Sequence, residues 1–152
     1  IKVEDNGIDE KTAYPEIIST GVPDIMLPVK SKEILDKIKV HKERLTKLSQ
    51  DLNVIGVHAF YLPRINSREV YTRNFAPLVG IDEEAATGTS NGALLYYLKK
   101  NNFIDSNELV AYQGELMNRP STIYCRFEEG DGEYTIKVGG KAKIVMSGIL
   151  SL

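Results

Sequence analysis

One segment, residues 92–100 (GALLYYLKK), limits the possible folds more than any other part of the sequence. Its apolar and aromatic residues run without interruption over residues 93–98 and would cover every side of a helix, because successive residues lie about 100° apart around a helix axis. A helix with this pattern has no polar face to present to water. We therefore expect a helix that is buried nearly all round and forms the axis of the fold.

The C-terminal third contains the strands that we expect to enclose this helix. Apolar and polar residues alternate over residues 122–127 and again over residues 133–138, which is typical of strands with one buried face. Residues 130–132 (GDG) can turn the chain between them, and Gly139-Gly140 is a two-residue hairpin signal before residues 141–150. The apolar members of these strands are Ile123, Cys125, Phe127, Tyr134, Ile136 and Val138. The patterns predict an α+β domain in which an antiparallel sheet curls around the central helix.

Extra surface helices are expected in the first half of the sequence. Ser31 is a good N-cap for a helix over residues 31–39, and residues 41–53 predict a second helix lying on a core. The apolar residues at helical spacing in the second helix are Leu45, Leu48 and Leu52. Strands are expected within residues 16–29 and 54–75, where β-branched and apolar residues are frequent.

Composition excludes several classes of protein. The 152 residues are 42% hydrophobic, which suits one domain over residues 1–152 with a real core. The 19 basic and 21 acidic residues give a formal net charge of −2, so neither nucleic acid nor a membrane is an expected partner. The lone Cys125 excludes an internal disulfide and suits a reducing cytoplasm. His41 and His58 lie far apart, so no metal site is expected.

The segment EEAATGTSNGALL, residues 83–95, places Thr87, Gly88, Thr89 and Ser90 at the start of the apolar helix. Two interpretations of these residues are open. Their hydroxyls and backbone N–H groups could bind an anion, or Thr89 or Ser90 could only cap its own helix. No Lys follows the glycines and the GxGxxG spacing is absent, so a small carboxylate fits this segment better than a phosphate.

Three acidic residues, Asp82, Glu83 and Glu84, come directly before this segment. If one of them is desolvated near the helix start, neighbouring acids raise its pKa while the helix dipole lowers it, which can suit a proton shuttle. The alternative is a solvated loop whose charges complement the helix N-terminus. The residues themselves leave both alternatives open.

Four stretches resemble the PhzF-like family of phenazine-biosynthesis isomerases, within the diaminopimelate-epimerase-like superfamily. They are, in order, residues 19–29 (STGVPDIMLPV), 73–98 (RNFAPLVGIDEEAATGTSNGALLYYL), 113–123 (QGELMNRPSTI) and 138–152 (VGGKAKIVMSGILSL). The resemblance implies a protein of two similar domains, each a sheet curled around a central helix, with the active site in the cleft between them. This chain resembles the C-terminal domain alone, and its first residue, Ile1, suits a fragment or a trimmed chain.

The resemblance also implies roles for single residues. In the family, a Thr-Gly-Ser segment at the helix start holds a substrate carboxylate, and Gly88 and Thr89 take those positions here. The family's Glu-Asp-Pro reads Glu83-Glu84-Ala85, so Glu84 would be the catalytic acid of this domain. The principal acid/base is a Glu of the missing N-terminal domain. No cysteine lies near residues 83–90, which argues against a racemase that uses two thiols.

The expected protein is therefore the C-terminal half of an isomerase or epimerase that needs no cofactor and shifts a proton on a small carboxylate substrate. Glu84 would be catalytic, and Thr87, Gly88, Thr89 and Ser90 would bind the substrate. The missing N-terminal domain is the expected partner, a homodimer is possible, and the isolated chain should be inactive. The alternative is a stand-alone module that binds an anion or takes part in assembly without catalysis.

Overall fold

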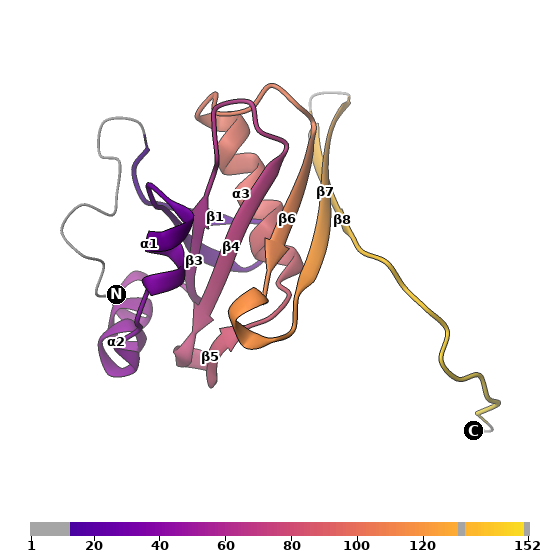
Figure 1. The fold of residues 1–152 in the computed structure, drawn as a ribbon, viewed down its shortest axis with the longest axis horizontal. Coiled ribbons are helices and arrows are strands. Elements are labelled where there is room, and N and C mark those ends of the chain that lie inside the picture. The colour runs from indigo at the N-terminus through magenta and orange to yellow at the C-terminus, as the bar shows by residue number, and fades with distance from the viewer. Residues whose placement is uncertain (1–12, 131–132, 151–152) are drawn as a thin grey trace.

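The apolar segment forms helix α3 (Gly88–Lys100), in which eight residues are buried. A computed structural model describes residues 13–130 and 133–150 of the chain and has α3 on the inner face of a curled sheet (Figure 1). Leu94, Leu95 and Leu98 are fully buried there, in a core shared with residues of the strands. Nearly every side of α3 is therefore covered, as its sequence requires.

The sheet has eight strands in the order β1-β2-β3-β4-β6-β7-β8, and β5 pairs with β4. Their bounds are β1 (Glu16–Ser19), β2 (Pro23–Pro28), β3 (Gly56–Tyr61), β4 (Glu69–Ala76), β5 (Ile81–Glu84), β6 (Glu108–Gln113), β7 (Ser121–Gly130) and β8 (Glu133–Gly139). The strands of the C-terminal third pair antiparallel as expected, but β2 pairs with β3, and β4 with β6, in parallel, so the sheet as a whole is mixed. Each parallel pair is joined by a connection that contains a helix, which returns the chain in its original direction.

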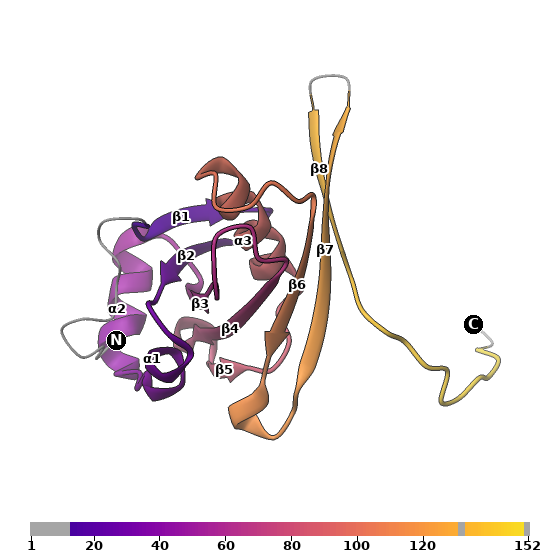
Figure 2. The same cartoon turned by 45° about the horizontal axis from the view of Figure 1, so that its top comes forward.

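Two short helices cover the opposite face of the sheet (Figure 2). They are α1 (Lys32–Lys37) and α2 (Lys42–Leu52), which follow one another between β2 and β3. Ser31 caps α1 as predicted, because its hydroxyl accepts a hydrogen bond from the N–H of Ile34 at 3.2 Å. Short 3₁₀ helices at Pro77–Val79 and Glu115–Met117 complete the structure. No helix in the described residues is long and apolar enough to cross a membrane.

Fewer leucines of α2 face the core than its sequence predicts. Leu45 is 1% exposed, but Leu48 and Leu52 are 43% and 45% exposed. Ser49 is the other fully buried position, one turn after Leu45 on the same side of the helix. The prediction that all three leucines face the core is therefore wrong, because the buried side of α2 consists of Leu45 and Ser49 while Leu48 and Leu52 lie at the surface.

The last two strands form a ribbon that extends beyond the body of the domain (Figure 2). Ile123, Cys125 and Phe127 of β7 are at most 7% exposed, as their alternation predicts. Tyr134 and Val138 of β8 are 61% and 41% exposed, so the prediction of a buried face on β8 is wrong for these two residues, and only Ile136 packs against the core. β8 is the terminal strand of the sheet, and only part of it lies against α3.

The chain after β8 does not fold back. Residues 140–150 form neither helix nor strand and extend away from the domain (Figure 1), so the predicted hairpin at Gly139-Gly140 is wrong. The primed hairpin turns need a positive φ, and neither glycine adopts one. The apolar side chains of this segment, which we call the tail, are 84% to 98% exposed: Ile144, Val145, Met146, Ile149 and Leu150.

Candidate functional site

The predicted anion site lies where strand β5 ends and helix α3 begins. β5 ends at Glu84 and α3 begins at Gly88, so all five predicted site residues lie within one connection and the first helical turn. Thr87 is the N-cap residue, but its side chain makes no capping hydrogen bond. Thr89 and Ser90 lie inside the helix, so the interpretation that either one only caps it is wrong.

The first N–H groups of α3 have no partner in the part of the chain that the structure describes. The backbone nitrogens of Gly88, Thr89 and Ser90 make no internal hydrogen bond, whereas that of Asn91 donates to the carbonyl oxygen of Thr87 at 3.2 Å. Thr89 is exposed and Gly88 is half-buried. Such groups attract anions, because the helix dipole adds to the partial charge of each free N–H.

An open groove lies beside the first of these groups, at Gly88. It has a volume of about 540 Å³ and is lined by Gly88 and Ala86 on one side and by β7 and β8 on the other. Thr122, Tyr124 and Val138 supply hydroxyl, aromatic and apolar walls. The volume is within the range of small-ligand sites, so a small molecule can reach the helix start from this side.

The hydroxyl groups of Thr87 and Ser90 lie on different sides of the helix start. Ser90 is 1% exposed and its hydroxyl donates to the carboxylate of Asp24, so only its backbone N–H is free for a ligand. Thr87 is half-buried, and its Oγ1 accepts a hydrogen bond from Nε2 of Gln113 at 2.9 Å. The hydroxyl proton of Thr87 is then available to an outside acceptor.

The three acidic residues before the helix have different partners. Asp82 is exposed and pairs with Lys42. Glu83 is mostly buried and makes a two-pronged ion pair with Arg73, at 2.8 Å from Nε to Oε1 and 2.9 Å from Nη2 to Oε2. Glu84 makes no ion pair within the described residues. Of the three, only Glu84 has a carboxylate that no cation of the described residues neutralises.

Glu84 is half-buried and held at its main chain. Its Oε1 accepts a hydrogen bond from the N–H of Ala85 at 2.9 Å, and its carbonyl oxygen accepts one from Nε2 of Gln113 at 2.7 Å. The second carboxylate oxygen makes no internal hydrogen bond in the described structure. Glu84 can therefore receive or donate a proton without first breaking a salt bridge.

A cluster of buried polar side chains, which we call the polar core, lies beneath the helix start. Its members are at most 4% exposed: Asp24, His58, Thr72, Asn74, Ser90, Asn91 and Gln113. Nδ2 of Asn74 lies 3.2 Å from both Ser90 Oγ and His58 Nδ1. On the other side of the ring, His58 Nε2 lies 3.2 Å from Asn91 Oδ1, and Nδ2 of Asn91 donates to Gln113 Oε1 at 2.9 Å.

His58 is neutral in this arrangement. Burial lowers its pKa to about 4, against the opposing effects of the Asp24 charge and the hydrogen bond to Asn91. The amide of Asn74 can only donate to Nδ1, so Nε2 carries the proton and donates to Asn91. The ring therefore connects two amides, one on β4 and one on α3.

The turn after β6 also contacts the site connection. Gly114 has φ 79°, and a Cβ atom there would lie 2.3 Å from the carbonyl oxygen of Arg119 and 2.7 Å from that of Ala85. The hydroxyl of Ser121 donates to the same Ala85 oxygen at 2.7 Å. The close approach requires glycine and brings residues 113–121 against residues 84–88.

The polar core was not predicted from the sequence, although polar residues beside apolar segments indicate it. Asn91 directly precedes the apolar run of α3, and Gln113 ends a strand whose inner face is apolar. Cys125, by contrast, is the core residue that its pattern predicts, and burial raises the pKa of its thiol to about 12. In the described residues, no three His, Cys, Asp or Glu side chains gather in a way that could hold a metal ion.

Comparison with known sequences gives matches over nearly the whole chain. Residues 2–148 match the family described as phenazine biosynthesis-like protein (PhzC-PhzF). An uncharacterized isomerase of Deinococcus radiodurans is 31% identical over 136 residues, which cover 86% of this chain and 44% of that protein. An uncharacterized isomerase of Clostridium acetobutylicum is 30% identical over 146 residues, 90% of this chain and 47% of the relative.

Solved structures agree on the fold. A PhzF-family phenazine biosynthesis protein of Bacillus anthracis superposes with a TM-score of 0.62 at 22% identity, over 80% of this chain and 43% of that one. A predicted epimerase of Pseudomonas aeruginosa gives a TM-score of 0.58 at 26% identity, over 88% of this chain and 46% of that one. The chain spans less than half of the length of each of these proteins.

Proposed function

Because the chain belongs to the phenazine biosynthesis-like (PhzC-PhzF) family, we propose that it is one half of a cofactor-independent isomerase or epimerase. The reaction would shift a proton on a small carboxylate substrate. Relatives named isomerases and a structural neighbour named a predicted epimerase support this class of reaction. Since the chain spans less than half of these proteins, the substrate would lie in a cleft between this domain and a second one.

The observation that carries the proposal is the set of unpaired donors at the start of α3. The N–H groups of Gly88 and Thr89 and the hydroxyl of Thr87 have no internal acceptor in the described structure. Two N–H donors match the two oxygens of a carboxylate, and the helix dipole favours its charge by about 0.3–1 kcal/mol at an exposed site. The N–H of Ser90 would add a further donor.

Glu84 would transfer the proton on this side of the substrate. It precedes Gly88 by one short connection, and no cation competes for its carboxylate in the described residues. A proton shift needs one group to take a proton from carbon and a group to return one to a second position. Glu84 would perform one of these steps, and an acid or base of the second domain would perform the other. The 152-residue chain alone would therefore be inactive.

Solvent deuterium exchange tests the proposal in the full-length protein that contains this chain. With a panel of small carboxylic acids in D₂O, we expect deuterium to appear at the carbon beside the carboxylate, detected by NMR. Glu84→Gln should slow this exchange by about 100-fold or more, because general acid–base catalysis contributes about that much. Asp82→Asn, which alters the exposed neighbouring acid, is the matched control and should keep the rate.

The alternative module without catalysis predicts a different result. It would bind a small carboxylate at Gly88 and Thr89, but no deuterium would enter any of the acids. Exchange that persists unchanged in Glu84→Gln would contradict the role of Glu84 while leaving the reaction class intact.

A further inference from the structure

We infer that Gln113 is the positioning residue of the proposed carboxylate site, because it joins Glu84, Thr87 and the first turn of α3 into one unit. The inference rests on the proposed function. Gln113 touches neither substrate nor reacting atoms, since it is 1% exposed. It would act by fixing the positions of Glu84 and of the helix-start donors.

The amide nitrogen of Gln113 holds the connection between β5 and α3 at two points. Nε2 donates to the carbonyl oxygen of Glu84 at 2.7 Å and to Oγ1 of Thr87 at 2.9 Å. The first bond fixes the main chain that carries the proposed acid. The second occupies the acceptor side of the Thr87 hydroxyl, so its proton must point elsewhere. One NH₂ group therefore sets the position of the acid and the orientation of a substrate donor.

The amide oxygen of Gln113 acts on the start of the helix. Oε1 accepts hydrogen bonds from the backbone N–H of Thr87 at 3.3 Å and from Nδ2 of Asn91 at 2.9 Å. Nδ2 of Asn91 also donates to the carbonyl oxygen of Thr87 at 2.8 Å. The N–H that precedes the helix is thus bonded inside the domain, while those of Gly88 and Thr89 have no partner among the described residues.

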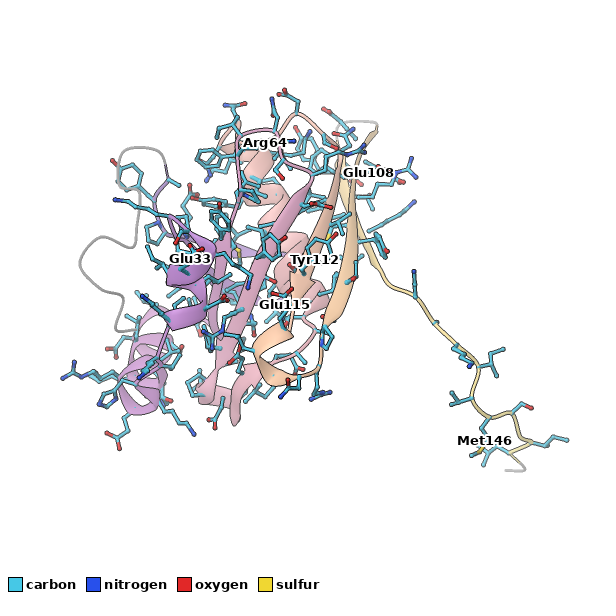
Figure 3. All side chains as sticks on the ribbon, in the orientation of Figure 1. Glu33, Arg64, Glu108, Tyr112, Glu115 and Met146 are labelled. Atoms are coloured by element: carbon cyan, nitrogen blue, oxygen red, sulfur yellow. The ribbon has the colours of Figure 1, made fainter. Side chains whose placement is uncertain are left out.

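Gln113 is itself held by the sheet. It is the last residue of β6 and pairs with Thr72 of β4 and Ser121 of β7 on either side. Tyr112 lies on the outer face of β6 (Figure 3), so the side chain of Gln113 points to the inner face, toward α3. Gln113 therefore holds the connection between β5 and α3 from a strand that is paired on both sides, and not from a mobile surface position.

The chemistry selects an amide at this position. A side chain here must donate twice from one end and accept from the other, and among side chains of this length only Gln does both. Gln113→Met keeps the length and loses every hydrogen bond. Gln113→Glu keeps the acceptor for Asn91 and Thr87 N–H but, when ionised, has no proton to donate to Glu84 O or Thr87 Oγ1. Comparing the two variants distinguishes the effect of the donor end of the amide from that of its acceptor end.

The test is a titration of the 152-residue chain with sodium acetate, in which binding is monitored by the ¹H–¹⁵N chemical shifts of the Gly88 and Thr89 amides. A titration with sodium chloride at matched ionic strength is the reference. In the wild-type chain we expect saturable shifts at both amides. Gln113→Met should weaken acetate binding by about tenfold, because displaced donors at the helix start would cost the acetate one to two of its hydrogen bonds. Gln113→Glu should weaken it as well, although it keeps the acceptor end.

Leu45→Ala is the control for stability, because Leu45 is buried on the opposite face of the sheet. It should lower the Tm at least as much as Gln113→Met and leave the acetate affinity unchanged. Wild-type affinity in Gln113→Met, or an equal loss in Leu45→Ala, would overturn the role of Gln113 alone. No saturable shift in the wild-type chain would overturn the proposed carboxylate site and the role of Gln113 together.

Discussion

At the scale of single residues, the buried histidine has a consequence for stability against pH. In the folded chain burial lowers the pKa of His58 to about 4, from an ordinary value of 6.5. The unfolded chain therefore binds a proton between these pH values that the folded chain does not take up. The contribution of His58 to the free energy of unfolding is complete above about pH 6.5 and is lost as the pH falls toward 4.

We predict that acidification from pH 7 to pH 4 removes on the order of 3 kcal/mol through this group, in addition to what the carboxylates contribute. Urea unfolding at a series of pH values measures the loss. His41→Gln removes the exposed second histidine and should leave the curve unchanged. The ring protons of His58 should show no titration in NMR spectra between pH 8 and pH 5. A titration near neutral pH would contradict a neutral, buried ring.

The residues of the proposed site differ in how far sequence alone could identify them. Donors at a helix start depend only on the local chain, so Thr87 and Gly88 are evident from a few residues of sequence. The polar core depends on contacts between distant segments. His58 contacts Asn91, 33 positions further along, and Gln113 contacts Glu84, 29 positions before it. No local pattern specifies such pairs, because each polar side chain alone is equally compatible with a position in water.

At the scale of the elements, the central helix carries the largest part of the inner core. Leu98→Ala should cost about 2–5 kcal/mol of unfolding free energy, because it removes a fully buried side chain and leaves a cavity. Leu48→Ala on α2 is the matched control, since Leu48 is 43% exposed and its loss should stay within about 0.5 kcal/mol. Equal costs for the two changes, measured by urea unfolding, would contradict the enclosed position of α3.

Element type was easier to predict than strand pairing. Alternation identifies a strand, but it contains no information on the neighbour or its direction. β2 and β3 are parallel because α1 and α2 lie between them, which only the whole connection determines. Likewise, β8 alternates as a half-buried strand should, yet Tyr134 and Val138 are 61% and 41% exposed, because β8 is the terminal strand of the sheet and no further strand covers it. The sequence pattern predicts that one face of a strand is apolar, but whether that face is buried depends on the tertiary structure.

At the scale of the whole molecule, the tail contributes nothing to the packing of this domain. Every described residue from 140 to 150 is exposed. A chain that ends at Lys141 should therefore keep its unfolding free energy within about 0.5 kcal/mol. It should also remain monodisperse at higher concentration, because five exposed apolar side chains are removed. Light scattering and urea unfolding measure the two effects.

A chain that ends at Glu129 is the control for this truncation. It also removes β8, which pairs along β7 and whose Ile136 packs against the core around α3, so it should unfold at clearly lower urea concentration. A loss of more than about 1 kcal/mol in the chain that ends at Lys141 would mean that the tail packs on the domain in solution.

The strands that enclose α3 come from both halves of the chain, so folding must form contacts of large sequence separation. Thr20 donates to the carbonyl oxygen of Thr89, 69 positions later, and Ser90 reaches back 66 positions to Asp24. During synthesis β1 and β2 leave the ribosome before the helix that buries them. Until α3 is available, their apolar faces are exposed to solvent or bound by chaperones. Contacts of such sequence separation close large loops, and chains dominated by them fold in milliseconds to seconds rather than microseconds. The domain should therefore fold more slowly than a helical bundle of the same length.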